Sequence, residues 1–145
     1  MKRLLRYVPV VAVIVMIFFL TMQNAQDTVR LSNGFGHFAL MLCEKLGLDT
    51  IKTRFDSSYE IRHIGHLIEY FALGVAAAFS FKKKIYALLI CVGISVTDQI
   101  LKIYVPGRHF DWMDLPFDVV GYISGLIITW TVILLISELR RKATE

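Results

Sequence analysis

Six ionisable residues lie in a short polar stretch between two strongly apolar segments, and their types suit binding or acid/base chemistry. The apolar segments run from Ile85 to Val96 and from Val119 to Ile136. The polar stretch and its edges hold Asp98, Lys102, Arg108, Asp111, Asp114 and Asp118. Ionisable groups are costly in hydrocarbon, so those in or beside membrane helices usually face a partner or a watered cavity. We therefore expect the function of the chain to reside here.

An earlier segment adds an imidazole and a further carboxylate. His66, Glu69 and Tyr70 are three and four positions apart and so share one helix face, which Arg62 extends toward the helix start. At a rise of about 1.5 Å per residue, Glu69 lies roughly 12 Å from a helix start at Ile61. A carboxylate at that depth needs a partner or a proton.

Two further spacings place charges on helix faces. Asp98 and Lys102 are four residues apart, which allows an internal salt bridge. One face of the last apolar segment carries, at intervals of four, three and four residues, Asp114, Asp118, Gly121 and Gly125. Glycines at this spacing let a second helix approach closely. We expect that approach to bring the acids against the facing helix.

The elements that position these residues are predicted to be membrane helices. Residues 1–145 are 56% hydrophobic, which favours a single integral membrane domain. Four segments approach the roughly 20 apolar residues that a span needs: Tyr7 to Met22, Ile61 to Phe81, Ile85 to Tyr104 and Leu115 to Ser137. No small-x-small cleavage site follows the first one, so we expect it to be an uncleaved span. The predicted fold is an all-α bundle of four transmembrane helices. Pro106 and Gly107 are expected to form the turn between the last two helices.

The basic residues give the expected orientation, because short cytoplasmic loops carry an excess of Lys and Arg. With four spans, nine basic residues fall on one side: Lys2, Arg3, Arg6, Lys82, Lys83, Lys84, Arg140, Arg141 and Lys142. Both termini are therefore predicted to be cytoplasmic. The net charge of +4 reflects this asymmetry, so we expect membrane lipids and no nucleic acid as partners.

Residues 23–60 form the one long connection, on the outer side. Phe35, Phe38, Leu42 and Leu46 recur at helical spacing within it. This stripe predicts an amphipathic helix that covers the outer mouth of the bundle.

The expected depth of the polar residues in the membrane supports a common site. This topology puts five polar residues from three spans in the outer half of the membrane: His66, Glu69, Asp98, Asp114 and Asp118. A polar cavity that faces the outside accounts for their shared level.

Structural explanations stand beside this one. Asp114 could be a helix N-cap, and Arg108 an interfacial anchor or phosphate contact. His63 and His109 are expected to be solvated near the interface. Glu69, Asp98 and Asp118 could equally form a network with His66 or Arg108 that only holds the helices together.

The ordered residues resemble the VanZ-like family. The first motif, Arg-x-x-x-His-x-x-Glu-Tyr-x-x-Leu-Gly, falls on Arg62 to Gly74, and the Asp-x6-Val-Pro-Gly-Arg motif runs from Asp98 to Arg108. Asp-x-x-x-Asp and Gly-x-x-x-Gly follow at Asp114 to Gly125, within a likeness that covers residues 61–136. The family commonly reads Asp-Glu-x-His-Gln where this chain has Asp98-Gln99-Ile100-Leu101-Lys102. An activity that depends on that Glu, His or Gln would be lost or altered here.

The resemblance implies a multi-pass protein of the bacterial cytoplasmic membrane, in a family whose name-giving member raises resistance to the glycopeptide teicoplanin. It implies no defined reaction, so whether the chain is an enzyme stays open, and so does its oligomeric state. A divalent cation held by Asp98, Asp114 and Asp118 is conceivable, but nothing in their spacing is diagnostic of a metal site. No metal site is therefore assigned, and no cofactor is expected.

Three functions remain in view. The first is binding of a cell-envelope component, such as a lipid-linked cell-wall precursor or another anionic ligand. The expected binding residues are Arg62, His66, Glu69, Tyr70, Asp98, Arg108, Asp114 and Asp118. The second is an enzyme that modifies an envelope lipid or precursor, with Glu69, Asp118 and His66 as candidate catalytic residues. The third, a small transporter subunit, is weakened by the absence of visible repeats.

Overall fold

The computed structural model describes residues 2–23, 34, 41, 45 and 58–143. This part of the chain is helical and contains no strand. Its helices are α1 (Lys2–Leu5), α2 (Val8–Thr21), α5 (Ser58–Ser80), α6 (Lys84–Lys102) and α7 (Asp114–Lys142). The amphipathic helix expected between residues 23 and 60 lies outside the described residues.

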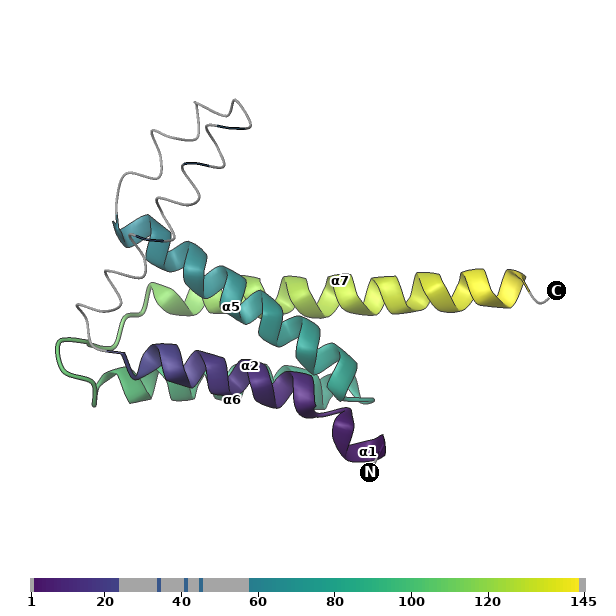
Figure 1. Ribbon diagram of the computed structural model, residues 1–145, viewed down its shortest axis with the longest axis horizontal. Helices are drawn as coiled ribbons and strands as arrows, with labels where there is room; N and C mark the ends of the chain where they lie inside the picture. The colour runs from purple at the N-terminus through teal and green to yellow at the C-terminus, as the bar shows by residue number, and fades with distance from the viewer. Residues whose placement is uncertain (1, 24–33, 35–40, 42–44, 46–57, 144–145) are drawn as a thin grey trace.

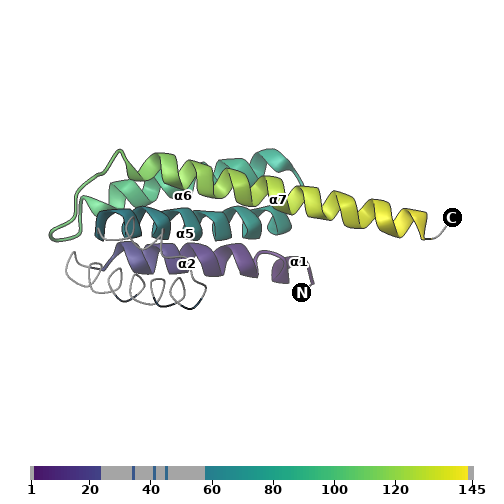
Figure 2. The ribbon, with the colours of Figure 1, turned by 90° about the horizontal axis from the view of Figure 1, so that it is seen from above.

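The four long helices form one bundle with α5 at its centre. Helix α5 contacts α2, α6 and α7, and its most extensive packing is against α7. Figure 2 shows α5 running between α2 on one side and the α6–α7 layer on the other. In Figure 1, α5 crosses α7, and α7 extends well beyond the other helices toward the C-terminus. All four helices lie where the apolar segments predict them, although α7 continues past the expected end at Ser137 to Lys142.

A tight turn reverses the chain between α6 and α7. The Arg108 N–H donates to the Val105 carbonyl at 3.1 Å, and Gly107 between them has a φ of 76°. Proline in the second position and a glycine with positive φ in the third are the requirements of a type II turn. The expected Pro106–Gly107 turn is therefore confirmed, and it fixes where the polar connection starts.

Glycines allow the backbones of α5 and α7 to approach each other closely. A Cβ added at Gly121 would lie 2.6 Å from the Leu67 carbonyl oxygen, and one at Gly125 would collide with the Phe71 carbonyl. Gly74 on α5 faces the Tyr122 backbone in the same way. The expectation that Gly121 faces a neighbouring helix is confirmed.

Membrane character is strongest in the last two helices. Within the described residues, α6 and α7 are long and apolar enough to cross a membrane. Helix α2 is apolar but has only 14 residues, and α5 carries the polar face with His66 and Glu69.

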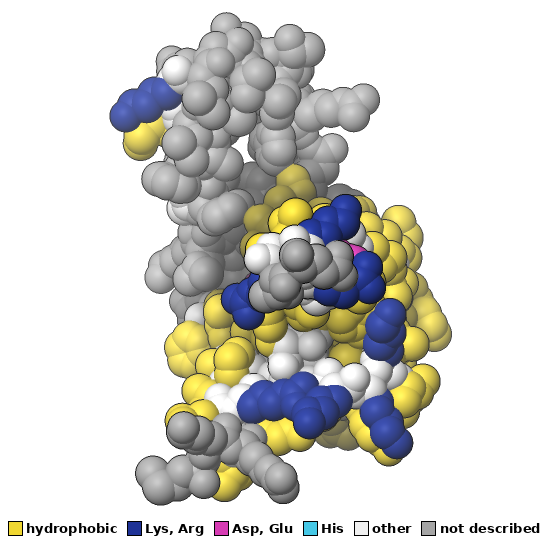
Figure 3. All heavy atoms as spheres, turned by 90° about the vertical axis from the view of Figure 1, so that its right-hand side faces the viewer, with side chains coloured by type: hydrophobic (Ala, Val, Ile, Leu, Met, Phe, Trp, Pro, Cys, Tyr) yellow, Lys and Arg dark blue, Asp and Glu magenta, His cyan; other side chains and the backbone are white. Residues whose placement is uncertain are grey.

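Basic side chains gather at one end of the bundle. Figure 3 looks onto that end, where Lys and Arg side chains are conspicuous among the apolar ones. Exposed members of this set are Lys82, Lys83, Lys84, Arg140, Arg141 and Lys142. The N-terminus and the α5–α6 turn lie at this end as well (Figure 1).

We expect Gly121→Leu to lower the free energy of unfolding by about 1–3 kcal/mol, because the larger side chain must push α5 and α7 apart. Gly93→Leu is the matched control, since nothing lies within 4 Å of a Cβ at that position on α6. Unfolding in detergent, followed by circular dichroism, measures both. Equal stability of the two variants would show that α7 does not pack on α5 through Gly121.

Candidate functional site

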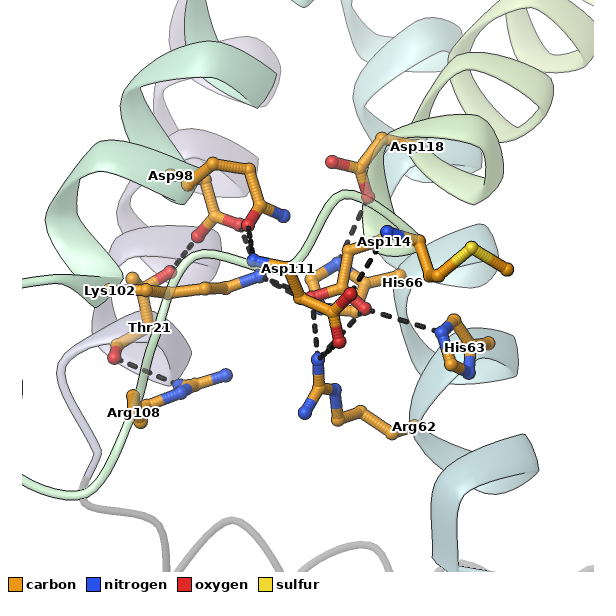
Figure 4. Close-up of polar contacts among 12 residues, drawn as sticks. Thr21, Arg62, His63, His66, Asp98, Lys102, Arg108, Asp111, Asp114 and Asp118 are labelled. Carbon is orange, nitrogen blue, oxygen red and sulfur yellow. Dashed lines mark hydrogen bonds and ion pairs between the residues drawn. The ribbon is translucent and has the colours of Figure 1, made fainter.

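A buried cluster of charged side chains lies at the end of the bundle opposite the basic residues. It draws on the end of α2, the first half of α5, the end of α6, the α6–α7 connection and the start of α7 (Figure 4). Asp98 and Lys102 are each 1% exposed, and Asp114 and Asp118 are fully buried. These residues come from only two helices, so the contacts from α5 decide how the cluster is completed.

Lys102 lies at the centre of the cluster. Its Nζ is 2.9 Å from Asp114 Oδ2, 3.1 Å from Asp98 Oδ2 and 3.2 Å from His66 Nε2. The contact with Asp98 confirms the internal pair on α6 that their four-residue spacing predicts. The other two contacts join α6 to α7 and to α5, so one ammonium group links three helices.

Asp114 contacts more basic side chains than any other aspartate of the cluster. Arg62 Nη2 donates to both of its oxygens, at 2.8 and 3.0 Å, and also to Asp111 Oδ2 at 2.8 Å. His63 Nε2 lies 3.5 Å from Asp114 Oδ1, and His63 is only 3% exposed. The expectation that His63 is solvated is therefore wrong, because the start of α5 packs against α7 here and covers the ring. The ring also lies against Phe117, with centroids 4.6 Å apart and planes tilted by 44°.

The Asp114 side chain does not cap its helix. Met113 is the N-cap residue of α7, and no side-chain hydrogen bond caps that end. Asp114 instead points into the cluster and accepts the hydrogen bonds of Arg62 and Lys102.

Asp118 has a different set of partners. One oxygen lies 3.0 Å from His66 Nδ1, and the other accepts a hydrogen bond from Ser95 Oγ at 2.8 Å. The His66 ring stacks against Tyr70, with centroids 6.2 Å apart and planes inclined by 17°. Tyr70 is fully buried, so it fixes the orientation of the imidazole.

Helix α2 joins the cluster through two residues. The Thr21 hydroxyl donates to Asp98 Oδ1, and the Arg108 Nη1 donates to the Leu20 and Thr21 carbonyls at 3.1 and 2.9 Å. A guanidinium that binds the last carbonyls of a helix stabilises the helix end. Burial lowers the pKa of Arg108, and nearby Asp98 opposes that shift.

Glu69 stands at the margin of the cluster. Its side chain is half-buried and within electrostatic range of His66, Asp98 and Asp118. Within residues 58–143, the Glu69 side chain forms no hydrogen bond and no ion pair. The fold thus brings Asp98, Asp118 and His66 together directly and places Glu69 beside them, while their roles in binding remain predictions.

Sequence reasoning missed some members of the cluster. Thr21, Ser95 and Gln99 were not singled out; the Gln99 Oε1 accepts the Asp111 backbone N–H at 3.3 Å. The sequence does contain a signal for Ser95: it lies three residues before Asp98 and so shares the helix face of Asp98 and Lys102. Thr21 had none, since no periodicity links it to α6.

Carboxylates outnumber permanent cations in this cluster. Within the described residues, four aspartates gather here, Asp98, Asp111, Asp114 and Asp118, and Lys102 and Arg62 contact the first three of them. Buried negative charge without a cation is costly, so the cluster suits a bound cation or a polar group that donates hydrogen bonds. Two residue groups have ligand atoms within 4.8 Å of one another, as a metal site requires: His63–Asp111–Asp114 and His66–Asp98–Asp118.

We expect Lys102→Met to lower the free energy of unfolding by about 3–5 kcal/mol, because it leaves Asp98 and Asp114 buried with one fewer cation. Lys82→Met is the control, since that side chain is exposed at the opposite end of the bundle. Thermal unfolding of the two variants in detergent makes the comparison. A loss no larger than that of the control would mean that Lys102 is solvated.

Comparison with known proteins agrees with this arrangement of motifs. The VanZ/LLP1 family model matches residues 7–135, which include α2 and the polar cluster. No curated protein and no solved structure matches the chain. Because the family match spans most of the chain, the protein belongs to the VanZ/LLP1 family.

Proposed function

We propose that the chain crosses the bacterial cytoplasmic membrane four times, with both termini in the cytoplasm. The apolar character of α6 and α7 supports crossing, and α2 and α5 pack alongside them in one bundle. The basic residues of the α5–α6 turn and of the end of α7 mark the cytoplasmic end. In this orientation the aspartate cluster lies toward the outer side of the membrane.

The function that this geometry supports best is binding of a polar group of a cell-envelope component. The observation that carries the proposal is the buried excess of carboxylates where α5, α6 and α7 meet. A structural network would reach its lowest energy with every charge paired. Asp118 departs from that: the partners shown for it in the described part of the chain are His66 and Ser95, with no direct lysine or arginine contact.

Arg62 and Asp111 form the partly exposed rim of the cluster. Their side chains are 28% and 18% exposed, whereas that of Asp114 behind them is fully buried. A ligand that enters from the outer side meets this pair first. Asp118 and His66 lie deeper, beyond Asp114.

The charge balance selects the chemistry of the bound group. An amine or a hydroxyl can donate hydrogen bonds to Asp118, whereas an anion would add to the negative charge already buried there. Arg108, expected to meet an anion, donates to the carbonyls of α2 instead. The amino and hydroxyl groups of a lipid-linked cell-wall precursor fit these requirements. Binding such a precursor would link the protein to teicoplanin susceptibility, the phenotype that its family suggests.

One observation favours a second candidate, an enzyme that modifies such a precursor. His66 Nδ1 lies 3.0 Å from Asp118 Oδ1. These are the residue types of a carboxylate that orients a histidine general base, and realignment of the two side chains would form the hydrogen bond that this role requires. Lys102 lies 3.2 Å from the other ring nitrogen, so catalysis would require that lysine to move aside. Turnover of the precursor, followed by mass spectrometry, distinguishes this candidate from binding alone.

The topology can be tested with single cysteines in place of Lys83 and His109, in a background without Cys43 and Cys91. A membrane-impermeant maleimide added to intact cells should label the residue-109 cysteine and leave the residue-83 cysteine unlabelled until the cells are opened. Labelling of both from the same side would contradict the four-span topology.

Binding can be tested with Asp118→Asn, which keeps an oxygen to accept the Ser95 hydrogen bond and removes the charge. We expect affinity for a lipid-linked disaccharide–pentapeptide in nanodiscs to fall about tenfold or more, because a charged hydrogen bond contributes about 1.5–3 kcal/mol. Native mass spectrometry measures the bound fraction. Glu138→Gln, at an exposed position near the other end, should bind as the unmodified protein does. Equal affinity in Asp118→Asn would remove this residue from the binding site.

A further inference from the structure

We infer that His66, Asp98 and Asp118 form a binding site for a divalent metal cation. One ligand atom from each residue lies within 4.8 Å of the others. The residues are 7%, 1% and 0% exposed, and they come from α5, α6 and α7. Two carboxylates and one imidazole suit cations such as Mn²⁺ and Zn²⁺. The sequence spacing could not indicate this set, because each ligand stands on a different helix.

Unsatisfied atoms provide a second, independent reason. His66 Nδ1, Asp98 Oδ2 and Asp118 Oδ1 are buried, and none of them has a hydrogen-bond partner within the described residues. Nδ1 and the Asp118 oxygen are 3.0 Å apart, and Asp98 Oδ2 is 3.1 Å from Lys102 Nζ, but neither contact has hydrogen-bond geometry. Buried polar atoms normally have such partners. A metal ion would satisfy all three atoms together.

The charge of the cluster matches that of the proposed ion. Counted as formal charges without the imidazoles, the four aspartates of the cluster carry four negative charges. The described cations that contact three of them, Lys102 and Arg62, carry two positive charges, which leaves two negative charges. A divalent cation at His66, Asp98 and Asp118 would neutralise both, at the side of the cluster away from Arg62. The alternative group, His63, Asp111 and Asp114, already receives the Arg62 guanidinium, which leaves less negative charge for an ion.

Lys102 is the competitor of the metal. Its ammonium contacts Asp98 and His66, two of the three proposed ligand residues, and also Asp114 outside the set. In the metal-bound protein, Lys102 keeps Asp114 and yields Asp98 to the ion. Removal of the ammonium should therefore tighten metal binding, which a purely structural salt-bridge network would not show.

The test uses the full chain, purified in detergent, stripped with EDTA and dialysed against Mn²⁺. Elemental analysis gives the bound metal, and electron paramagnetic resonance reports its coordination. We expect about one Mn²⁺ per chain, affinity lowered about tenfold or more in Asp118→Asn, and affinity raised in Lys102→Met. Glu138→Gln, which removes an exposed carboxylate near the other end of the bundle, should bind as the unmodified protein does.

A second measurement, the change in melting temperature of each variant on addition of Mn²⁺, applies even if a variant is less stable. Mn²⁺ should raise the melting temperature of Lys102→Met and leave that of Asp118→Asn unchanged. The inference is overturned if neither the unmodified chain nor Lys102→Met binds metal stoichiometrically, or if Asp118→Asn binds metal as tightly as the unmodified protein does. The inference concerns the same cluster as the proposed function, but metal content is measured without an envelope ligand, so each can fail alone.

Discussion

The Lys102 ammonium group is the contact on which the arrangement of α5, α6 and α7 depends at the end of the bundle opposite the basic residues. It meets a carboxylate of its own helix, Asp98, and one of α7, Asp114, and it touches His66 of α5. All these groups are buried, and buried charges are tolerated only when partners are close and well placed. The three helix ends therefore cannot separate without stranding charge in the interior. The same demand explains why the acids of α6 and α7 share one level of the bundle.

Close glycine packing makes this charge arrangement possible. Gly121 lies one helical turn below Asp118 and touches the backbone of α5 at Leu67, next to His66. Because the two backbones nearly touch there, Asp118 comes within 3.0 Å of the imidazole. A bulkier residue at Gly121 would push α5 and α7 apart and so lengthen the distance between Asp118 and His66. Stability and the geometry of the charged cluster are thus two results of one helix crossing, at the place where the proposed metal would bind.

The features that sequence alone predicted are those with a local signal. Apolar length located the helices, Pro106–Gly107 predicted the turn, and four-residue spacing predicted the Asp98–Lys102 pair. Apart from the close approach of α5 and α7 at Gly121, contacts between helices had no such signal. The burial of His63 and the pairing of Arg62 with Asp111 depend on how the start of α5 packs over the α6–α7 connection. The hydrogen bonds from Arg108 to the last carbonyls of α2 likewise depend on how the helices pack. So does the grouping of possible metal-ligand atoms from three helices.

The coupling between Lys102 and Asp114 tests most directly whether a buried ion pair unites the helices. A double-mutant cycle with Lys102→Met and Asp114→Asn, measured by unfolding of the full chain in detergent, gives this coupling as a free energy. Contacting charged residues in one network show interaction energies of about 0.5–3 kcal/mol. We predict a coupling of more than about 1 kcal/mol, because the groups are 2.9 Å apart and shielded from water. Additivity of the two substitutions within about 0.3 kcal/mol would contradict the account.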